Sequence, residues 1–193
     1  MFQCAVSWQR GARWCRQLRK SDRAKMEFWD DAVVKNTPPT IEDIYRSPGH
    51  LIRRCQQISA SVFADELGEF GLTPVQYASL LAIRDRPDID QRSLGRMIAI
   101  DRSTIGTVMK GLEDRELITR TTPPNNLRIK VMRVTERGES LLIKSVNAIA
   151  NVQKRLLAPL CPEDQKTLLR LLSQVVDVNN SQSRAPLEIK KEP

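Results

Sequence analysis

The strongest constraint on the fold is a pair of short helical runs, residues 91–98 and 102–116, that lie almost end to end in the sequence. An aspartate precedes each run, Asp90 and Asp101. Aspartate in this position is an N-cap signal, because its carboxylate accepts hydrogen bonds from the free N–H groups of the first helical turn. Only two residues separate Asp101 from the first run, so the second helix must turn sharply away from the first. This spacing predicts a helix-turn-helix, a motif that presents its second helix to the major groove of DNA.

The second predicted helix sorts its side chains onto two faces. Apolar residues recur at helical spacing and are expected in the core: Ile105, Val108, Met109 and Leu112. The outer face keeps the residue types that bond phosphates and base edges: Arg102, Ser103, Thr104, Thr107 and Lys110. Gly106 is expected on this outer face, where a missing side chain lets the backbone approach DNA closely. The alternative is an ordinary, poorly optimised surface helix.

Two strand-like runs follow, residues 117–121 and 128–134, and the second alternates apolar with basic side chains. The segment between them, Thr122-Pro-Pro-Asn-Asn-Leu127, has the composition of a turn. A basic hairpin alone is usually a solvated edge. Directly after a recognition helix it indicates a wing, whose tip can insert Arg128, with Lys130 behind it, into the minor groove.

Five motifs stand out along the chain: Leu72-Thr-Pro-Val-Gln-Tyr77, Leu94, Asp101-Arg-Ser-Thr104, Leu112-Glu-Asp-Arg-Glu-Leu-Ile118 and Val134-Thr-Glu-Arg-Gly138. With them, residues 41–177 resemble the MarR family of winged-helix repressors. The family usually has Asp-x-Arg in the wing, where this chain has Asn126-Leu127-Arg128. The arginine matches and the acid that helps to brace the wing does not. A second departure is Glu116, where a glycine commonly ends the recognition helix.

The expected fold class is mainly α with a small β-wing (α+β), in which a winged helix-turn-helix module is flanked by N- and C-terminal dimerisation helices. The expected division of the chain is a basic leader over 1–40, a dimerisation and ligand-facing helix over 41–70, the DNA-binding module over 71–134, C-terminal dimerisation helices over 135–177, and a disordered polar tail over 178–193.

The terminal helices carry more apolar surface than the small winged module can cover, over about 41–70, about 135–157 and a last helix with Pro162 at its first position. The resemblance implies that they interlock two chains into a two-fold dimer, so that two recognition helices meet successive major grooves. The alternative is a monomeric helical bundle attached to the module.

The net charge of +8 is less informative than it looks, because residues 1–25 hold seven Lys/Arg against one Asp. Residues 88–134 hold nine Lys/Arg against six Asp/Glu, so the DNA-binding prediction depends on which faces carry the charge. The leader lacks the apolar stretch of a secretory signal and only weakly matches a transit peptide. It is either sequence ahead of a start at Met26, a basic arm that grips DNA, or a segment with another role.

A candidate effector site lies along the first predicted helix. Arg46, His50, Arg53 and Gln57 are spaced to share one face, Arg54 is adjacent, and Tyr77 lies on the next helix. Arginine pairs with carboxylates and tyrosine contacts rings, so the set suits a small aromatic carboxylate. The alternative is a solvated charged face. The resemblance implies the subgroup that controls aromatic-acid catabolism, with 6-hydroxynicotinate as effector and aroyl-CoA thioesters in a sister group, bound between the dimerisation helices and the winged module.

Taken together, the sequence predicts a homodimeric repressor of double-stranded DNA. Ser103, Thr104, Thr107 and Lys110 are expected at the major groove, and Arg128 with Lys130 at the minor groove. Phosphate contacts near the two helix N-termini are expected from Gln91, Arg92 and Arg102.

Two other classes of protein are alternatives to this prediction. A thiol-based redox sensor would use Cys55, which is expected on the apolar stripe, or Cys4 and Cys15 in the leader. An enzyme is disfavoured, because GxSxG and HExxH are missing and Leu112-Glu113 stand where a P-loop requires Lys-Ser/Thr.

With four scattered cysteines and His50 the only histidine, no metal or other cofactor is expected. The sequence holds no apolar run of membrane-spanning length, so no membrane partner is expected and the cytoplasm is the expected compartment.

Overall fold

The computed structural model describes residues 38–124 and 129–188, so the predictions for the leader up to residue 37, for Arg128 and for residues 189–193 lie outside the described residues. The chain forms two compact units, Met1–Arg54 and Cys55–Pro193. Across the described residues it is mainly helical with one small sheet, which confirms the predicted fold class.

The first unit holds α3 (Ile41–Arg46) and the beginning of α4 (Pro48–Leu67). The single helix predicted over 41–70 is therefore wrong. Proline has no N–H group and its ring disfavours helical backbone in the residue before it. Accordingly Ser47 is extended, with ψ at 141°, and α3 ends there before α4 begins.

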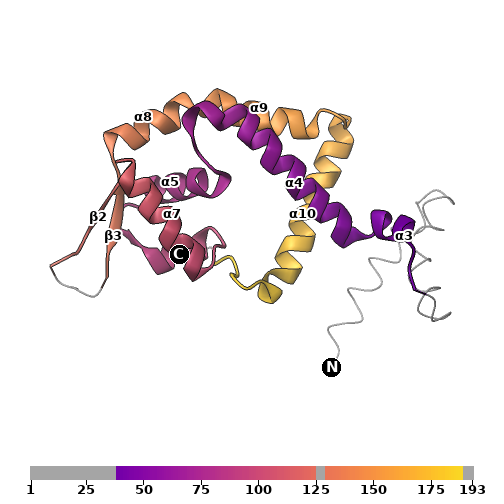
Figure 1. The fold of residues 1–193 in the computed structure, drawn as a ribbon, viewed down its shortest axis with the longest axis horizontal. Coiled ribbons are helices and arrows are strands. Elements are labelled where there is room, and N and C mark those ends of the chain that lie inside the picture. Colours follow the sequence, from indigo (N-terminus) through magenta and orange to yellow (C-terminus); the bar gives the residue numbers. More distant parts are fainter. Residues whose placement is uncertain (1–37, 125–128, 189–193) are drawn as a thin grey trace. The chain divides into compact units, whose positions relative to one another are not determined.

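The second unit contains the rest of α4 and all the elements that follow (Figure 1). They are η1 (Gly68–Phe70), α5 (Pro74–Asp85), β1 (Ile89–Asp90), α6 (Gln91–Met97), α7 (Arg102–Asp114), β2 (Ile118–Thr121), β3 (Val131–Val134), α8 (Glu136–Lys144), α9 (Val146–Leu157), α10 (Pro162–Asn179) and η2 (Asn180–Gln182). The helix predicted over 135–157 is thus two helices. They join at Ser145, which is buried and whose hydroxyl donates to the Leu142 carbonyl at 2.9 Å.

The predicted hairpin is present as β2 and β3, and a third strand that the sequence did not reveal, β1, pairs with the other side of β3. The sheet is antiparallel with the order β1-β3-β2. In the register Ile118 lies opposite Val134, and Ile89 lies opposite Met132. Because β1 leads directly into α6, this pairing fixes the start of the helix-turn-helix against the wing.

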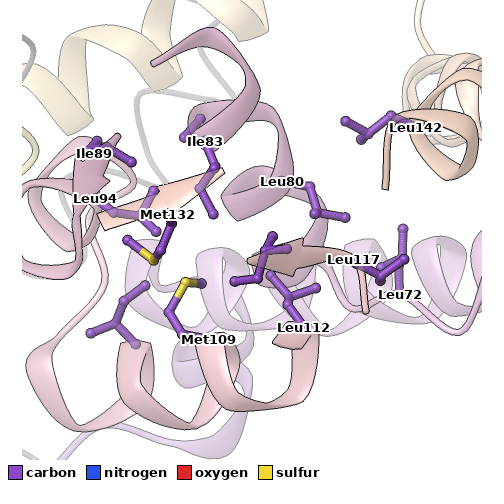
Figure 2. Packing of buried hydrophobic residues seen from close by; sticks show 13 residues of the cluster. Leu72, Leu80, Ile83, Ile89, Leu94, Met109, Leu112, Leu117, Met132 and Leu142 are labelled. Atoms are coloured by element: carbon purple, nitrogen blue, oxygen red, sulfur yellow. The ribbon is translucent and has the colours of Figure 1, made fainter. Parts of the chain in front are cut away.

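The core of the second unit lies between α5, α7 and the sheet, where the side chains of Leu80, Met109 and Met132 gather (Figure 2). Each of these three side chains has an exposed fraction of 0%. Burial of a large apolar side chain contributes about 1.5–3 kcal/mol to stability, so this cluster holds the module together. A smaller cluster of Phe63, Leu67 and Val152 joins α4 to α9.

The apolar faces predicted for dimerisation stay exposed in the single chain. No residue of α10 is buried, and Val176 is 57% exposed. Other large apolar side chains exposed in the same way are Ile44, Leu51, Ile52, Ile58, Ile143, Val146, Leu168, Leu169, Leu172 and Val175. In the part of the chain that the structure describes, no helix is long and apolar enough to span a bilayer.

The end of the chain differs from the predicted disordered tail. α10 continues to Asn179, and the turn after it is closed by the Asn180 side chain, whose Oδ1 accepts from the Leu187 N–H at 2.8 Å. Its Nδ2 donates to the Leu187 carbonyl at 3.0 Å. These local hydrogen bonds give residues 180–188 a defined path that polar composition alone does not predict.

Glu116 follows the C-cap of α7, Arg115, and lies in the left-handed region with φ at 57°. A side chain in this region costs about 1–2 kcal/mol, because Cβ crowds the following carbonyl. We expect Glu116→Gly to raise the free energy of unfolding by about 1 kcal/mol, measured by urea denaturation. Glu116→Ala is the control, since it also removes the exposed ion pair with Arg137 but keeps Cβ. Equal stability of the two variants would contradict strain at this position.

Candidate nucleic-acid interface

Both predicted N-caps are present and set the geometry of the helix-turn-helix. Asp90 Oδ1 accepts from the N–H groups of Arg92 at 2.8 Å and Ser93 at 3.0 Å. Asp101 Oδ1 accepts from the N–H groups of Ser103 at 3.0 Å and Thr104 at 2.9 Å. The two aspartates therefore begin α6 and α7 at the residues that the sequence predicted.

The turn between the helices is tight. Ala99 adopts a φ of 54°, and the Ile100 N–H donates back to the Gly95 carbonyl at 2.8 Å. A Cβ on Gly95 would lie 3.0 Å from the Ile100 carbonyl oxygen, so the turn and α6 approach as closely as their backbones allow. This close approach fixes the direction in which α7 leaves the turn.

The cap also decides what Ser103 and Thr104 can offer to DNA. Their hydroxyls both donate to the Asp101 carboxylate, and the Thr104 bond is 2.8 Å long. The Ser103 hydroxyl, followed by the Thr104 N–H and hydroxyl, holds the pKa of Asp101 well below its usual range. A hydroxyl has one hydrogen and two lone pairs, so both side chains keep acceptor capacity while their hydrogens are engaged. They suit base amino groups better than phosphates.

The Asp90 cap is similar but partly buried. Burial acts to raise the pKa of Asp90, yet hydrogen bonds from the Ser93 side chain and from the backbone lower it overall. Both cap residues are therefore carboxylates at neutral pH and hold the helix starts through charge-assisted hydrogen bonds.

The two faces of α7 agree with the prediction. Ile105, Met109 and Leu112 are buried. The five polar residues expected at DNA are all exposed: Arg102, Ser103, Thr104, Thr107 and Lys110. Gly106 departs from the prediction, because it is half-buried and a Cβ there would lie 3.6 Å from Gln91 Nε2 on α6. That distance is an ordinary van der Waals contact, so Gly106 faces α6 and the packing there would accept a methyl group.

Arg120 is a residue of this surface that the sequence reading missed. It lies on β2, and only 17% of its side chain is exposed. Its Nη2 donates to Gln91 Oε1 on α6 at 3.3 Å, and its Nη1 pairs with Glu113 Oε2 on α7 at 3.2 Å. One guanidinium thus joins the wing to both helices. The side chain of Gln91, predicted as a phosphate contact, is tied to the wing, whereas Arg92 is exposed. The available signal was a single basic residue in the first strand-like run, residues 117–121.

Of the charged residues of the wing, Lys130 is exposed to solvent, whereas Arg133 forms an ion pair. Lys130 is exposed beside Ile129, which is 38% exposed. Arg133, one of the basic residues of the predicted alternation, instead pairs with Asp88, its Nε donating to Asp88 Oδ1 at 2.7 Å. This hydrogen bond lowers the pKa of Asp88 and raises that of Arg133. Arg133 therefore braces the hairpin against the loop before β1.

The candidate effector residues fall into both units. In the first, His50 is half-buried, its ring centroid is 5.4 Å from that of Tyr45, and its Nδ1 lies 3.5 Å from Arg53 Nη2. Arg54 is exposed on α4, and Arg46 is exposed on α3, which ends at Ser47 and is a separate helix from α4. Tyr45 is an aromatic neighbour that the spacing argument missed.

In the second unit, Gln57 is exposed and Tyr77 is half-buried. The Tyr77 ring meets Phe63 edge-on, with centroids 6.4 Å apart. Cys55, expected on the apolar stripe, is exposed, and so is Cys161. Among the described residues no group of three His, Cys, Asp or Glu side chains is placed to hold a metal ion.

Comparison with known proteins gives one consistent result. The model of the MarR family matches residues 72–130. The HTH-type transcriptional repressor NicR of Pseudomonas putida is 27% identical over 146 residues, which cover 76% of this chain and 90% of NicR. The PcaV regulator of Streptomyces coelicolor, solved with its natural ligand, superposes with a TM-score of 0.66 at 32% identity, over 72% of this chain and 98% of PcaV.

A further solved structure concerns the regulation of DNA binding of Bordetella bronchiseptica BpsR by 6-hydroxynicotinic acid. It superposes with a TM-score of 0.63 at 26% identity and covers 67% of this chain and 98% of BpsR.

Proposed function

The chain belongs to the MarR family of transcriptional regulators, and we propose that it is a homodimeric repressor that a small aromatic carboxylate releases from its operator. The cytoplasm, where the DNA lies, is the fitting compartment. The observation that carries the proposal is the exposed polar face of α7 beside a wing with an exposed lysine. These are the two elements that winged-helix proteins place in the major and minor grooves.

In this proposal the residues of the interface take different roles. Thr107 and Lys110 lie in the major groove, and Ser103 and Thr104 accept from base amino groups. Arg92 and Arg102 bind phosphates at the edge of the groove, with Gln91 held in place by Arg120. Arg128 and Lys130 of the wing reach the minor groove. Base contacts supply the sequence preference and phosphate contacts supply most of the salt-dependent affinity.

Dimerisation is supported by the exposed apolar faces of α10 and of the junction between α8 and α9. Large apolar side chains exposed in this number on one helix favour an interaction site. A two-fold partner would cover the faces with the same faces of a second copy. The two α7 helices would then be presented to successive major grooves, about 34–36 Å apart.

The effector class is supported within the first unit, where Arg53 offers a guanidinium, His50 an imidazole and Tyr45 a ring to an aromatic acid. Tyr77, in the second unit, stays a predicted ring contact. BpsR, a relative regulated by 6-hydroxynicotinic acid, makes that compound the first to test. The effector can shift the equilibrium only by its differential affinity for the free and the DNA-bound states.

The test is fluorescence anisotropy on the DNA upstream of the protein's own gene, with scrambled DNA of the same length as control. 6-Hydroxynicotinate, nicotinate, benzoate and 4-coumaroyl-CoA are titrated into the preformed complex. Release by one compound supports the proposal and names the effector. If the protein binds specifically but none of the four compounds releases it, the effector assignment is wrong. Equal affinity for upstream and scrambled DNA would contradict the proposal that the chain is a repressor.

His50→Ala separates effector binding from DNA binding. We expect this variant to bind the upstream DNA with unchanged affinity and to need about tenfold more 6-hydroxynicotinate for release, because the imidazole and the Arg53 beside it lose their mutual arrangement. Ser61→Ala, an exposed change further along α4, is the control and should behave as wild type. An unchanged effector response in His50→Ala would remove His50 from the site.

Arg128→Ala tests the wing. Because a narrow A·T-rich minor groove concentrates negative potential, we expect this variant to lose about tenfold in affinity on A·T-rich flanks and little on G·C-rich flanks. The comparison is made by anisotropy on two duplexes that share the central site. Arg133→Ala is the matched control from the same hairpin, since Arg133 is engaged with Asp88 and should weaken both complexes little. Equal loss on both flanks for Arg128→Ala would contradict minor-groove insertion.

A thiol-based switch is the second candidate, favoured by the exposure of Cys55 on α4. Peroxide added to the wild-type complex in the same assay decides the matter. Release that Cys55→Ser abolishes would support a redox sensor, and a wild-type complex that peroxide leaves intact would end this reading.

A further inference from the structure

The chain returns to the DNA-binding module after α10. In Figure 1 the yellow end of α10 leads into an extended stretch that runs back toward the helix-turn-helix. The Glu188 N–H donates to the Arg96 carbonyl on α6 at 3.0 Å, and the Glu188 carboxylate pairs with the Arg96 guanidinium at 2.9 Å. The Asn180 side chain bonds Leu187, and the Ser183 N–H donates to the Asn180 carbonyl at 3.1 Å, so hydrogen bonds hold both ends of residues 183–188, the C-terminal segment.

The C-terminal segment forms one wall of a pocket of about 880 Å³. Its other walls come from α6, the start of α7 and the wing, so the pocket opens on the surface proposed to meet DNA. Six basic side chains line it against three acidic ones. Charge complementarity of this sign suits a phosphodiester backbone.

In the described part of the chain, the ion pairs and hydrogen bonds within the pocket leave several of its basic side chains without a partner charge. Asp90 and Asp101 are engaged as N-caps, and Glu188 is engaged by Arg96. Arg120 pairs with Glu113. Four cations of the lining have no ion pair within the described residues: Arg92, Arg102, Lys130 and Arg184. The first three are residues predicted to meet DNA, and the fourth comes from the C-terminal segment.

We propose that the C-terminal segment is a further DNA-contacting element, in which Arg184 binds a backbone phosphate at the pocket that α6, α7 and the wing share. The inference rests on the proposed function. A guanidinium offers a planar set of donors that fits phosphate oxygens, and Arg184 lines the same pocket as Arg92, Arg102 and Lys130. Asn180 acts as a positioning residue, since its two hydrogen bonds to Leu187 hold the segment in place.

The opposite reading is that the segment covers the pocket and competes with DNA. The charges argue against it. Within the described part of the segment the Glu188 carboxylate is already paired with Arg96, whereas Arg184 adds a cation without an ion pair to the pocket lining. A cover for a cationic surface needs acidic groups facing it. If the segment contacts DNA, removing the Arg184 side chain weakens DNA binding. If the segment covers the pocket, removing it strengthens DNA binding.

The experiment measures the dissociation constant of the full chain on the upstream DNA at several salt concentrations. Each phosphate contact contributes about 0.9 to the slope of log affinity against log salt. We expect Arg184→Ala to weaken binding about threefold to tenfold at low salt and to reduce the slope by about 1. Arg184→Lys should keep the slope, because the cation remains. Asn180→Ala should lose part of both, although it changes no charge.

Arg170→Ala, an exposed arginine on α10, is the matched control and should leave affinity and slope as in wild type. An Arg184→Ala protein with wild-type slope overturns the inference, and one that binds more tightly shows that the segment is a cover. Failure of the proposed function looks different, since wild type itself would then fail to prefer the upstream DNA. The slopes of wild type and Arg184→Ala can still be compared on whatever DNA is bound.

Discussion

Thr107→Glu is expected to lower the affinity for operator DNA about 100-fold, which corresponds to about 2.7 kcal/mol, while the protein stays folded. Thr107 is exposed in the middle of the polar face of α7, one turn after Ser103 and one turn before Lys110. Its hydroxyl has no hydrogen-bond partner in the part of the chain that the structure describes, so no local contact is lost. A carboxylate at this point would face base-edge acceptors and phosphates, and it would be desolvated without a partner.

The control has the same charge change on another helix. Gln153→Glu lies exposed on α9, away from the polar face of α7, and should retain wild-type affinity. Both variants should unfold at the wild-type urea concentration. Anisotropy on upstream and scrambled DNA then measures the effect, and Thr107→Glu binding within about threefold of wild type would place α7 outside the groove.

Gly138→Ala is expected to have the largest effect on stability, about 3 kcal/mol or more, since overpacking in a well-packed site costs that much when the backbone cannot move. A Cβ on Gly138 would lie 2.3 Å from the Leu117 carbonyl oxygen and 2.6 Å from Val134 Cγ1. The Leu117 oxygen is fixed, because it accepts from the Thr135 N–H at 3.1 Å. The first turn of α8 therefore has to separate from the start of the wing.

Gly68→Ala provides the comparison, because a Cβ there meets nothing within 4 Å. Urea denaturation should give Gly68→Ala nearly wild-type stability and Gly138→Ala a much lower midpoint. If Gly138→Ala does not fold at 25 °C, its urea midpoint in the presence of a stabilising osmolyte still ranks it against Gly68→Ala. Equal midpoints would mean that α8 and the wing are not in the close contact described above.

Local sequence signals explain why the centre of the fold was predictable. The two aspartate caps and the apolar spacing of α7 act within one or two helical turns, and each is present as expected. The breaks at Ser47 and Ser145 were missed because a periodic apolar pattern continues across them. Proline at position 48 was the one signal that pointed to the first break. β1 was missed because a two-residue strand has no periodicity of its own.

The candidate site shows the same division. Exposure of Thr107 and Lys110 followed from helical periodicity, which is local. The roles of Arg120 and Arg133 depend on partners 29 and 45 residues away in the chain, and no spacing rule identifies such partners. The path of residues 183–188 was missed for a similar reason, since composition predicts solvation and the Asn180 and Arg96 contacts are particular to this chain.

The most direct test of a dimer that reads two half-sites is hydroxyl-radical footprinting of the full chain on the DNA upstream of its gene. The account predicts two protected blocks whose centres are about 10–10.5 base pairs apart, or a multiple of that spacing, with related sequences in opposite orientation. Both blocks should disappear together in Thr107→Glu and on addition of the effector that the anisotropy titration identifies. A single protected block, or protection spread evenly along the duplex, would contradict the dimeric repressor.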